Sequence, residues 1–132
     1  MEAEPIDLTK SEIDLLAKLV WHEAQGDTYE GQKAVAQVVV NRMYHSAFPD
    51  TIEGVIYQRG QFSGVHRLSR AAPTEQIYEA VHEVLSGDYI LPETVVYFWT
   101  NHVPGRGGWF RWKHENHFYG EVGEHYFYHF KE

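Results

Sequence analysis

Residues 16–26 of this chain read Leu-Ala-Lys-Leu-Val-Trp-His-Glu-Ala-Gln-Gly. If this segment is a helix, successive residues are rotated by about 100°, and one arc of the helix surface is apolar. That arc contains Ile13, Leu16, Ala17, Leu19, Val20 and Ala24. Glu23 falls in the middle of the same arc. The spacing therefore predicts a helix that turns one carboxylate toward the protein interior.

The position of Glu23 predicts a raised pKa for its carboxyl group. Burial disfavours a charged carboxylate, and the negative end of the helix dipole also favours protonation. A carboxylic acid that is still protonated near neutral pH is suited to general acid catalysis. Two structural interpretations stay open beside the catalytic one. Glu23 extends from the helix end into solvent, or it pairs with an arginine such as Arg42.

The neighbouring segments carry helix start and stop signals. Thr9-Lys-Ser-Glu12 has the spacing of a capping box, and Gly26 is placed to end the first helix. Asp27-Thr-Tyr-Glu30 repeats the spacing, so we expect Asp27 and Glu30 to be cap residues of a second helix. The apolar positions of that helix are Ala34, Val35, Val38, Val39 and Met43. The β-branched run Val38-Val-Val40 within it is compatible with a strand. The caps, the length and the flanking helix formers favour a buried helix instead.

Two further helices are predicted before residue 90. Phe48-Pro-Asp-Thr51 indicates a turn and a cap, followed by a short helix with Ile52, Val55 and Ile56 on one side. Residues 59–72 are rich in glycine and serine and are predicted to form a loop. Pro73-Thr74 starts a fourth helix that Gly87 ends. Its apolar positions are Ile77, Ala80, Val81, Val84 and Leu85.

The composition changes after residue 94. Thr94–Trp99 is β-branched and aromatic and is predicted to be a strand. Pro104–Gly108 indicates a turn, Trp109–Trp112 is a candidate second strand, and Glu124–Phe130 alternates as a third. The expected fold class is α+β, with a helical lobe followed by a small antiparallel sheet. We expect residues 1–132 to form a single domain.

The overall composition excludes several classes of protein. The chain has 132 residues, no cysteine and a formal net charge of −8. The charge argues against nucleic-acid binding, and the absence of cysteine rules out disulfides and thiol chemistry. No apolar run approaches the roughly 20 residues of a membrane helix. The acidic N-terminus shows no secretory signal, so we expect synthesis in the cytoplasm, export by another route or a trimmed catalytic domain.

The C-terminal third is strongly aromatic. Between Tyr97 and Phe130 there are 12 Phe, Trp and Tyr residues in 34 positions. Such rings build the core of a small sheet, and they also stack on sugar rings in a glycan-binding cleft. We expect about half of them to be core residues. Tyr97, Trp99 and Trp109, beside the polar Asn101 and His102, are the candidates for exposed rings.

Metal chemistry is not expected. The dipeptide His22-Glu23 suggests a zincin, but the second histidine of the H-E-x-x-H motif is absent. The later histidines are dense enough to consider zinc, and they are His102, His114, His117, His125 and His129. No complete ligand motif is visible among them, and surface or hydrogen-bonded histidines are the more common outcome. We expect no cofactor.

Four segments of the chain can be compared with a known family: residues 16–42, residues 48–58, Gln61-Phe-Ser-Gly-Val65 and Val122-Gly-Glu-His-Tyr-Phe-Tyr128. They closely resemble the SleB/CwlJ-type cell-wall hydrolases, the family of spore-cortex-lytic catalytic domains. The last is similar to the closing G-x-H-x-F pattern of the family. The matching segments follow the family order over nearly the whole chain, whereas residues 101–120 match loosely.

The resemblance implies a peptidoglycan-cleaving enzyme with a fold similar to lysozyme-like lytic transglycosylases. It places the single essential glutamate of the family at Glu23. The implied reaction cleaves between N-acetylmuramic acid and N-acetylglucosamine and leaves an anhydro-muramyl product. The expected partner is wall or cortex peptidoglycan, and expected sites of action are the cell wall and the spore cortex.

Substrate contacts are expected from a loop and from the predicted strand. The candidates are Gln61, Phe62, Ser63, Tyr97, Trp99 and Asn101. Ser63 is placed to orient Glu23, or is a turn residue, and Asn101 is placed to bind an N-acetyl group. Two alternatives stay open: an N-acetylmuramoyl-L-alanine amidase, which would need zinc, and an inactive glycan-binding module with the same fold.

Overall fold

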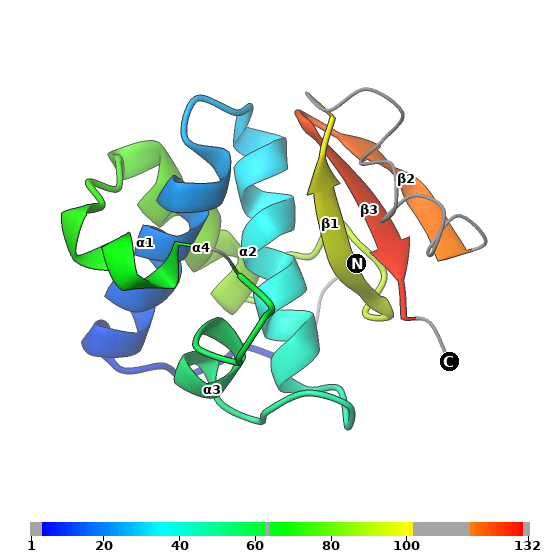
Figure 1. The fold of residues 1–132 in the computed structure, drawn as a ribbon, viewed down its shortest axis with the longest axis horizontal. Coiled ribbons are helices and arrows are strands. Elements are labelled where there is room, and N and C mark those ends of the chain that lie inside the picture. Colours follow the sequence, from blue (N-terminus) through cyan, green and yellow to red (C-terminus); the bar gives the residue numbers. More distant parts are fainter. Residues whose placement is uncertain (1–3, 63, 102–116, 131–132) are drawn as a thin grey trace.

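The computed structural model describes residues 4–62, 64–101 and 117–130. Its helices and strands, in chain order, are α1 (Lys10–Ala24), α2 (Tyr29–Met43), α3 (Ile52–Ile56), the 3₁₀ helix η1 (Val65–Arg70), α4 (Glu75–Leu85), β1 (Val95–Thr100), β2 (Phe118–Val122) and β3 (His125–His129). The helices form one lobe, and the strands form an antiparallel sheet in the order β1-β3-β2 (Figure 1). The predicted α+β architecture is confirmed.

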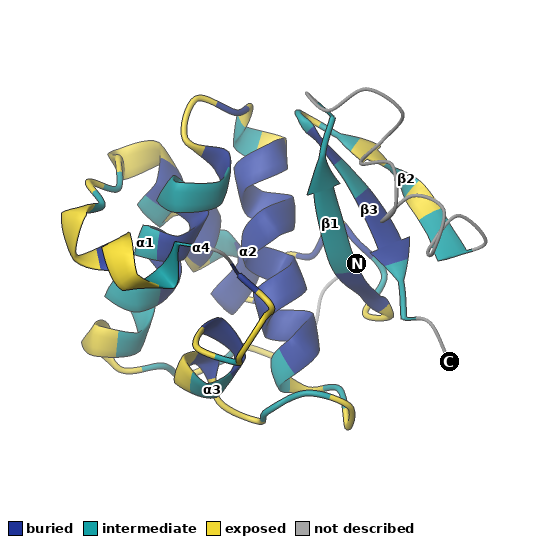
Figure 2. Cartoon of the chain, viewed as in Figure 1, coloured by how far each residue is buried: buried dark blue, intermediate teal, exposed yellow. Residues whose placement is uncertain are grey.

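Helix α2 lies between the other helices and the sheet (Figure 1). All residues from Gly31 to Arg42 are buried, and α2 is dark along this stretch in Figure 2. Because α2 is covered on every side, its buried residues are not confined to one stripe of the helix. The run Val38-Val-Val40 is therefore helical, as the flanking helix formers predicted.

Three polar side chains of α2 hydrogen-bond the chain that leads into β1. Gln37 donates to the carbonyl of Leu91 at 2.6 Å and accepts from the backbone N–H groups of residues 90 and 91, both at 2.9 Å. Asn41 donates to the carbonyls of residues 92 and 95, and Arg42 donates through Nε to the carbonyl of Val96. These backbone groups lie in the segment that precedes β1 and in the first two residues of β1, and α2 supplies side-chain partners for them.

The start and stop signals in the sequence are confirmed for α1 and α4. Thr9 and Glu12 form a capping box at the start of α1, and Thr74 caps α4. Gly26 and Gly87 follow these helices with φ of 80° and 94°. Positive φ is a conformation that glycine adopts without steric cost, so each glycine lets the chain reverse direction.

The predicted caps of α2 are wrong. Its N-cap is Thr28, whose hydroxyl accepts from the N–H of Gly31 at 3.0 Å. The Asp27 carboxylate instead accepts from the N–H of Glu124 at 3.0 Å, across 97 positions of the chain. Local spacing suggested that Asp27 caps the helix. Its side chain instead accepts a hydrogen bond from a residue far away in the sequence.

Two elements differ from the prediction. Residues 65–70 of the predicted loop form η1, in which Leu68 is buried against the helical core. Strand β2 was not predicted. It pairs with β3, and the pairing register shifts between residues 118 and 120. The candidate strand at residues 109–112 lies outside the described residues.

Within the described part of the chain, no helix is both long and apolar enough to span a membrane.

We predict that Gln37→Leu lowers the free energy of unfolding by about 3 kcal/mol, because each buried backbone group left without a partner costs about 1–3 kcal/mol. Urea denaturation followed by circular dichroism would measure the change. The matched control is Gln76→Leu, which removes an exposed amide with one bond to Gln32 and should cost less than about 1 kcal/mol. Similar losses in both variants would contradict the role of Gln37.

Candidate active site

Glu23 lies in the last turn of α1 and is half-buried. Burial raises the pKa of its carboxyl group from 4.5 to about 7, and the positive charge of Arg42 opposes this rise. The direction agrees with the prediction from the helical wheel, and desolvation is its main cause. A carboxyl group with this pKa can donate a proton near neutral pH and take one back afterwards.

The guanidinium group of Arg42 occupies a buried site lined by aromatic rings. Its Cζ atom lies 4.9 Å from the ring centroid of Phe62, 5.0 Å from that of Phe48 and 5.8 Å from that of Tyr97. Nη1 donates to Oε1 of Gln61 at 3.2 Å. Burial lowers the pKa of Arg42 to about 10, so it stays charged at neutral pH.

Arg42 does not form an ion pair with Glu23 among the described residues, since no contact within 4 Å joins the two side chains. The charge acts on Glu23 through space, and it lowers the pKa of the carboxyl group without closing a salt bridge. Glu23 is therefore left in an environment where both protonation states are accessible near pH 7.

His125 connects the sheet to the end of α1. Its Nδ1 lies 3.0 Å from Oδ2 of Asp27, and both side chains are buried. Burial lowers the pKa of His125, against the opposing effects of Asp27 and of the Glu23 backbone. The turn that follows the candidate acid thus holds a buried imidazole.

The loop before η1 packs closely on the end of α1. Gly64 has a φ of 76°, and a Cβ atom built on it would overlap the ring of His22, the residue before Glu23. Phe62 is buried, and its ring stacks on Phe98 of β1 at 6.1 Å between centroids. The side chain of Gln61 accepts from Arg42. Two of the three predicted loop residues therefore lie around Arg42, and Ser63 lies outside the described residues.

The predicted strand residues are half-buried and not fully exposed. Tyr97 stacks on Phe130 with 6.3 Å between ring centroids, and its edge faces Phe48. Trp99 pairs with Tyr126 across the sheet. Asn101 donates through Nδ2 to Oε2 of Glu121 at 2.7 Å and to the carbonyl of Gly123 at 3.2 Å. The amide nitrogen of Asn101 thus holds the turn between β2 and β3. Trp109 and His102 lie outside the described residues.

The histidines do not gather around a common point in the described ranges, where no group of three or more His, Cys, Asp or Glu side chains could hold a metal ion. His125 pairs with Asp27, and His129 lies 2.7 Å from the hydroxyl of Thr94. His114, one of the predicted candidates, is outside those ranges.

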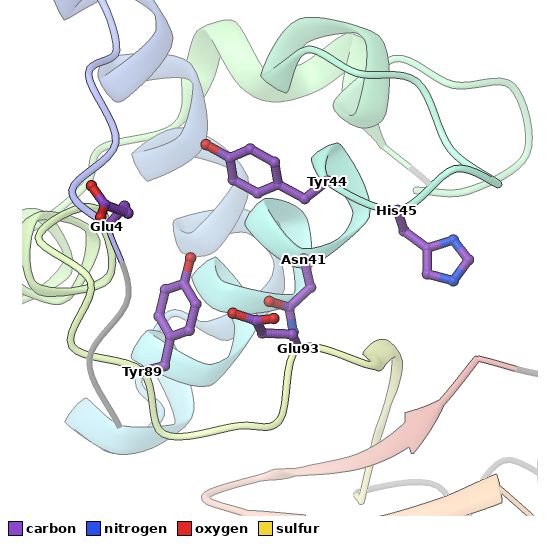
Figure 3. Close-up of a pocket in the computed structure, with 6 residues that line it drawn as sticks. All are labelled: Glu4, Asn41, Tyr44, His45, Tyr89 and Glu93. Carbon is purple, nitrogen blue, oxygen red and sulfur yellow. The ribbon is translucent and has the colours of Figure 1, made fainter.

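A pocket of about 430 Å³ lies at the C-terminal end of α2, the end away from the turn that follows Glu23 (Figure 3). It is lined by Glu4, Asn41, Tyr44, His45, Tyr89 and Glu93. None of these residues was predicted as a site residue. Neither Glu23 nor Arg42 is among its lining residues.

Two residues of the site region have roles that the sequence does not reveal. The sequence suggests Arg42 only as a salt-bridge partner of Glu23, and His125 only as a zinc ligand. The closing G-x-H-x-F pattern is a signal for His125, because it places this residue in the last strand. No local pattern indicates that this strand meets the turn after α1.

Comparison with known proteins supports a common fold and family. The family model described as Cell Wall Hydrolase matches residues 26–128. A spore cortex-lytic enzyme from Oceanobacillus iheyensis is 38% identical over 84 residues, which is 63% of this chain and 30% of that protein. The chain thus spans about a third of the length of the curated relatives it matches.

Two solved structures match over nearly their whole length. One is the catalytic domain of the Bacillus cereus SleB protein, with a TM-score of 0.77, 28% identity and coverage of 95% of this chain and 94% of that chain. The other is the catalytic domain of the germination-specific lytic transglycosylase SleB from Bacillus anthracis, with a TM-score of 0.76, 27% identity and coverage of 94% and 98%. With a family model that matches most of its length and a shared catalytic-domain fold, this chain belongs to the cell wall hydrolase family.

Proposed function

We propose that this chain is a lytic transglycosylase that cleaves the glycan strands of peptidoglycan, with Glu23 as its single acid–base residue. The observation that carries the proposal is the half-buried Glu23 carboxyl group, whose pKa burial raises to about 7. The family model begins at residue 26, so the role of Glu23 rests on its environment and not on that match. The fold shared with the SleB catalytic domains supports the choice of reaction.

The proposed reaction needs one carboxyl group in two successive states. Protonated Glu23 donates its proton to the glycosidic oxygen as the bond from that oxygen to C1 of the muramyl residue breaks. The Glu23 carboxylate then takes the proton of the muramyl 6-hydroxyl as O6 forms a bond to C1. The products are a 1,6-anhydro-muramyl end and a free hydroxyl on the leaving sugar, and water is not consumed.

The neighbouring carboxylates favour this single-acid reaction. Hydrolysis with two carboxylates requires a second one about 5–9 Å from the acid. Asp27, the carboxylate nearest to Glu23 in sequence, is buried and bound by His125 and by two backbone N–H groups. Glu30 is exposed on α2. Arg42 assists the second half of the reaction, because its charge stabilises the Glu23 carboxylate.

The relatives suggest which peptidoglycan to test first. The curated relatives are named spore cortex-lytic enzymes, and one structural match is named a germination-specific lytic transglycosylase. Cortex peptidoglycan is therefore the proposed substrate, and vegetative wall is the comparison.

We predict that Glu23→Gln folds normally and loses nearly all lytic activity, because positioned acid–base groups contribute about 10²–10⁴-fold to rate. The loss of turbidity of purified peptidoglycan measures the rate. Glu30→Gln, in the exposed first turn of α2, is the matched control and should keep its activity. A Glu23→Gln rate above about a tenth of the wild-type rate would remove Glu23 from this role.

We predict that activity falls as the pH rises through about 7, because Glu23 must be protonated to start the reaction. The folded state holds this proton between pH 4.5 and about 7, whereas the unfolded chain releases it near 4.5. Over this interval, wild-type stability should therefore fall relative to Glu23→Gln by about 3 kcal/mol. Turnover and urea unfolding at several pH values would measure both effects. A rate that is flat from pH 5 to 9 contradicts the assignment.

The products and the effect of chelation distinguish this reaction from amide hydrolysis. We expect mass spectrometry of digested wall or cortex to show anhydro-muramyl ends, and we expect activity to survive exhaustive dialysis against EDTA. Reducing ends would indicate a hydrolytic glycosidase. Free stem peptides, with activity abolished by EDTA and restored by zinc, would indicate the amidase.

A further inference from the structure

The pocket at the C-terminal end of α2 carries two carboxylates that no nearby cation balances. Its volume of about 430 Å³ lies within the range of about 300–1,000 Å³ that small-molecule sites occupy. The Glu4 and Glu93 side chains are exposed at the pocket, and neither has an ion-pair partner among the described residues. The described lining residues include no lysine and no arginine. The pocket is therefore electronegative.

Tyr89 brings a buried hydroxyl group to the pocket, and the described part of the chain gives this hydroxyl no hydrogen-bond partner. The residue is only 7% exposed, and in Figure 3 its hydroxyl points toward Tyr44. Burial raises the pKa of Tyr89, and Tyr44 and Glu93 raise it further. A buried polar group without a partner is costly, and native proteins pair nearly all of them. The hydroxyl is therefore open to a group that occupies the pocket.

Asn41 adds a second buried acceptor to the lining. It is 4% exposed, and its Nδ2 donates to the carbonyls of residues 92 and 95 at 3.0 and 2.8 Å. These two bonds use both N–H groups of the amide and fix its orientation. Its Oδ1 accepts from no group in the described ranges. This oxygen is thus the atom of Asn41 left to contact a ligand.

The position of the pocket also favours a positive ligand. It lies at the C-terminal end of α2, where the negative end of the helix dipole attracts cations. Tyr44 and Tyr89 line it with aromatic rings, whose faces attract ammonium groups within about 6 Å. His45 is turned away from them in Figure 3, with its ring 4.3 Å from that of Phe130 between centroids.

This set of groups distinguishes between classes of ligand. The two carboxylates repel an anion. A sugar needs donors as well as acceptors, whereas the carboxylates and Oδ1 of Asn41 only accept. In the described ranges no group of three or more His, Cys, Asp or Glu side chains could hold a metal ion. A protonated amine has three donors and no acceptor, and it matches the lining best.

We propose that this pocket binds an alkylammonium group, that is, a protonated amine on a short aliphatic stem. The Glu93 carboxylate, Oδ1 of Asn41 and the hydroxyl oxygen of Tyr89 are its acceptors, and the stem lies against the tyrosine rings. The inference does not rest on the proposed function, because neither Glu23 nor Arg42 lines the pocket.

An NMR titration of nitrogen-15-labelled protein tests the site directly. The probe is Nα-acetyl-lysine amide, and the matched probe is its Nε-acetylated form, which keeps the stem and lacks the charge. We expect saturable shifts at residues 41, 44, 89 and 93 with the first probe only, weakened by added salt. Equal binding of the two probes overturns the proposal. So does saturable binding of N-acetylglucosamine at these residues when the lysine probe does not bind.

Three variants separate the pocket from the general negative charge of the protein. Glu93→Gln keeps the shape of the side chain and should weaken the lysine probe by about tenfold, because charge-assisted hydrogen bonds are the stronger ones. Tyr89→Phe removes only the hydroxyl and should weaken the probe by about threefold without lowering stability. The matched control is Glu79→Gln, which removes an exposed carboxylate of α4 outside the pocket and should keep the wild-type affinity.

Two results with these variants contradict the proposal. One is an affinity that Glu79→Gln lowers as much as Glu93→Gln does, because net charge would then explain the binding. The other is an unchanged affinity in Glu93→Gln. That residue is exposed, so its replacement leaves the fold intact, and the variant decides the matter even if Tyr89→Phe does not fold.

Free amino groups on the stem peptides of peptidoglycan and small soluble amines present the same chemistry. Sedimentation on ice with purified peptidoglycan, before and after its amino groups are acetylated, distinguishes the two sources. Weaker binding of the acetylated wall by wild type, but not by Glu93→Gln, assigns the site to the wall. Equal binding of both walls, with the lysine probe bound, assigns it to a soluble amine. No step requires glycan cleavage, so these results stand whether or not Glu23 is the acid.

Discussion

The polar side chains of α2 tie the helical lobe to the chain that enters the sheet. Gln37, Asn41 and Arg42 sit on a helix that is buried on every side, and each bonds backbone groups of residues 90–96. A buried polar side chain is costly unless it is paired, and so is a buried backbone group in an irregular segment. Each satisfies the other here, which fixes where β1 begins and hence where the sheet packs.

Residues at or beside the two ends of α2 position the side chains of the candidate active site. At the N-terminal end, the turn carrying Asp27 binds His125 and the backbone of Glu124. Toward the C-terminal end, Arg42 reaches among the rings of Phe48, Phe62 and Tyr97. Burial raises the pKa of Glu23 while the charge of Arg42 lowers it. The balance places an acid near neutrality without a salt bridge that would trap it as a carboxylate.

The amino-acid sequence predicts what depends on local order and misses what depends on distant partners. Apolar periodicity and caps locate α1, α2, α3 and α4, and the apolar arc around Glu23 is enough to indicate a desolvated acid. Asp27 has the local spacing of a cap, but its bond to Glu124 crosses 97 positions, which no local pattern contains. Strand β2, with Gly120 inside it, carries a weak strand signal. The non-sequential strand order β1-β3-β2 also has no local signature.

The bond between Asp27 and the β2–β3 turn has a consequence for how the protein matures. Contacts between residues almost a hundred positions apart form late in folding, because a long loop must be closed before they are gained. During synthesis, the helical lobe emerges from the ribosome well before Gly123 and His125. Until that hairpin docks, the Asp27 carboxylate lacks its partners at residues 124 and 125, and the turn after α1 is not tied to the sheet. A partly made chain therefore carries every residue of α1 and yet lacks this connection, which forms only once the last strand is in place.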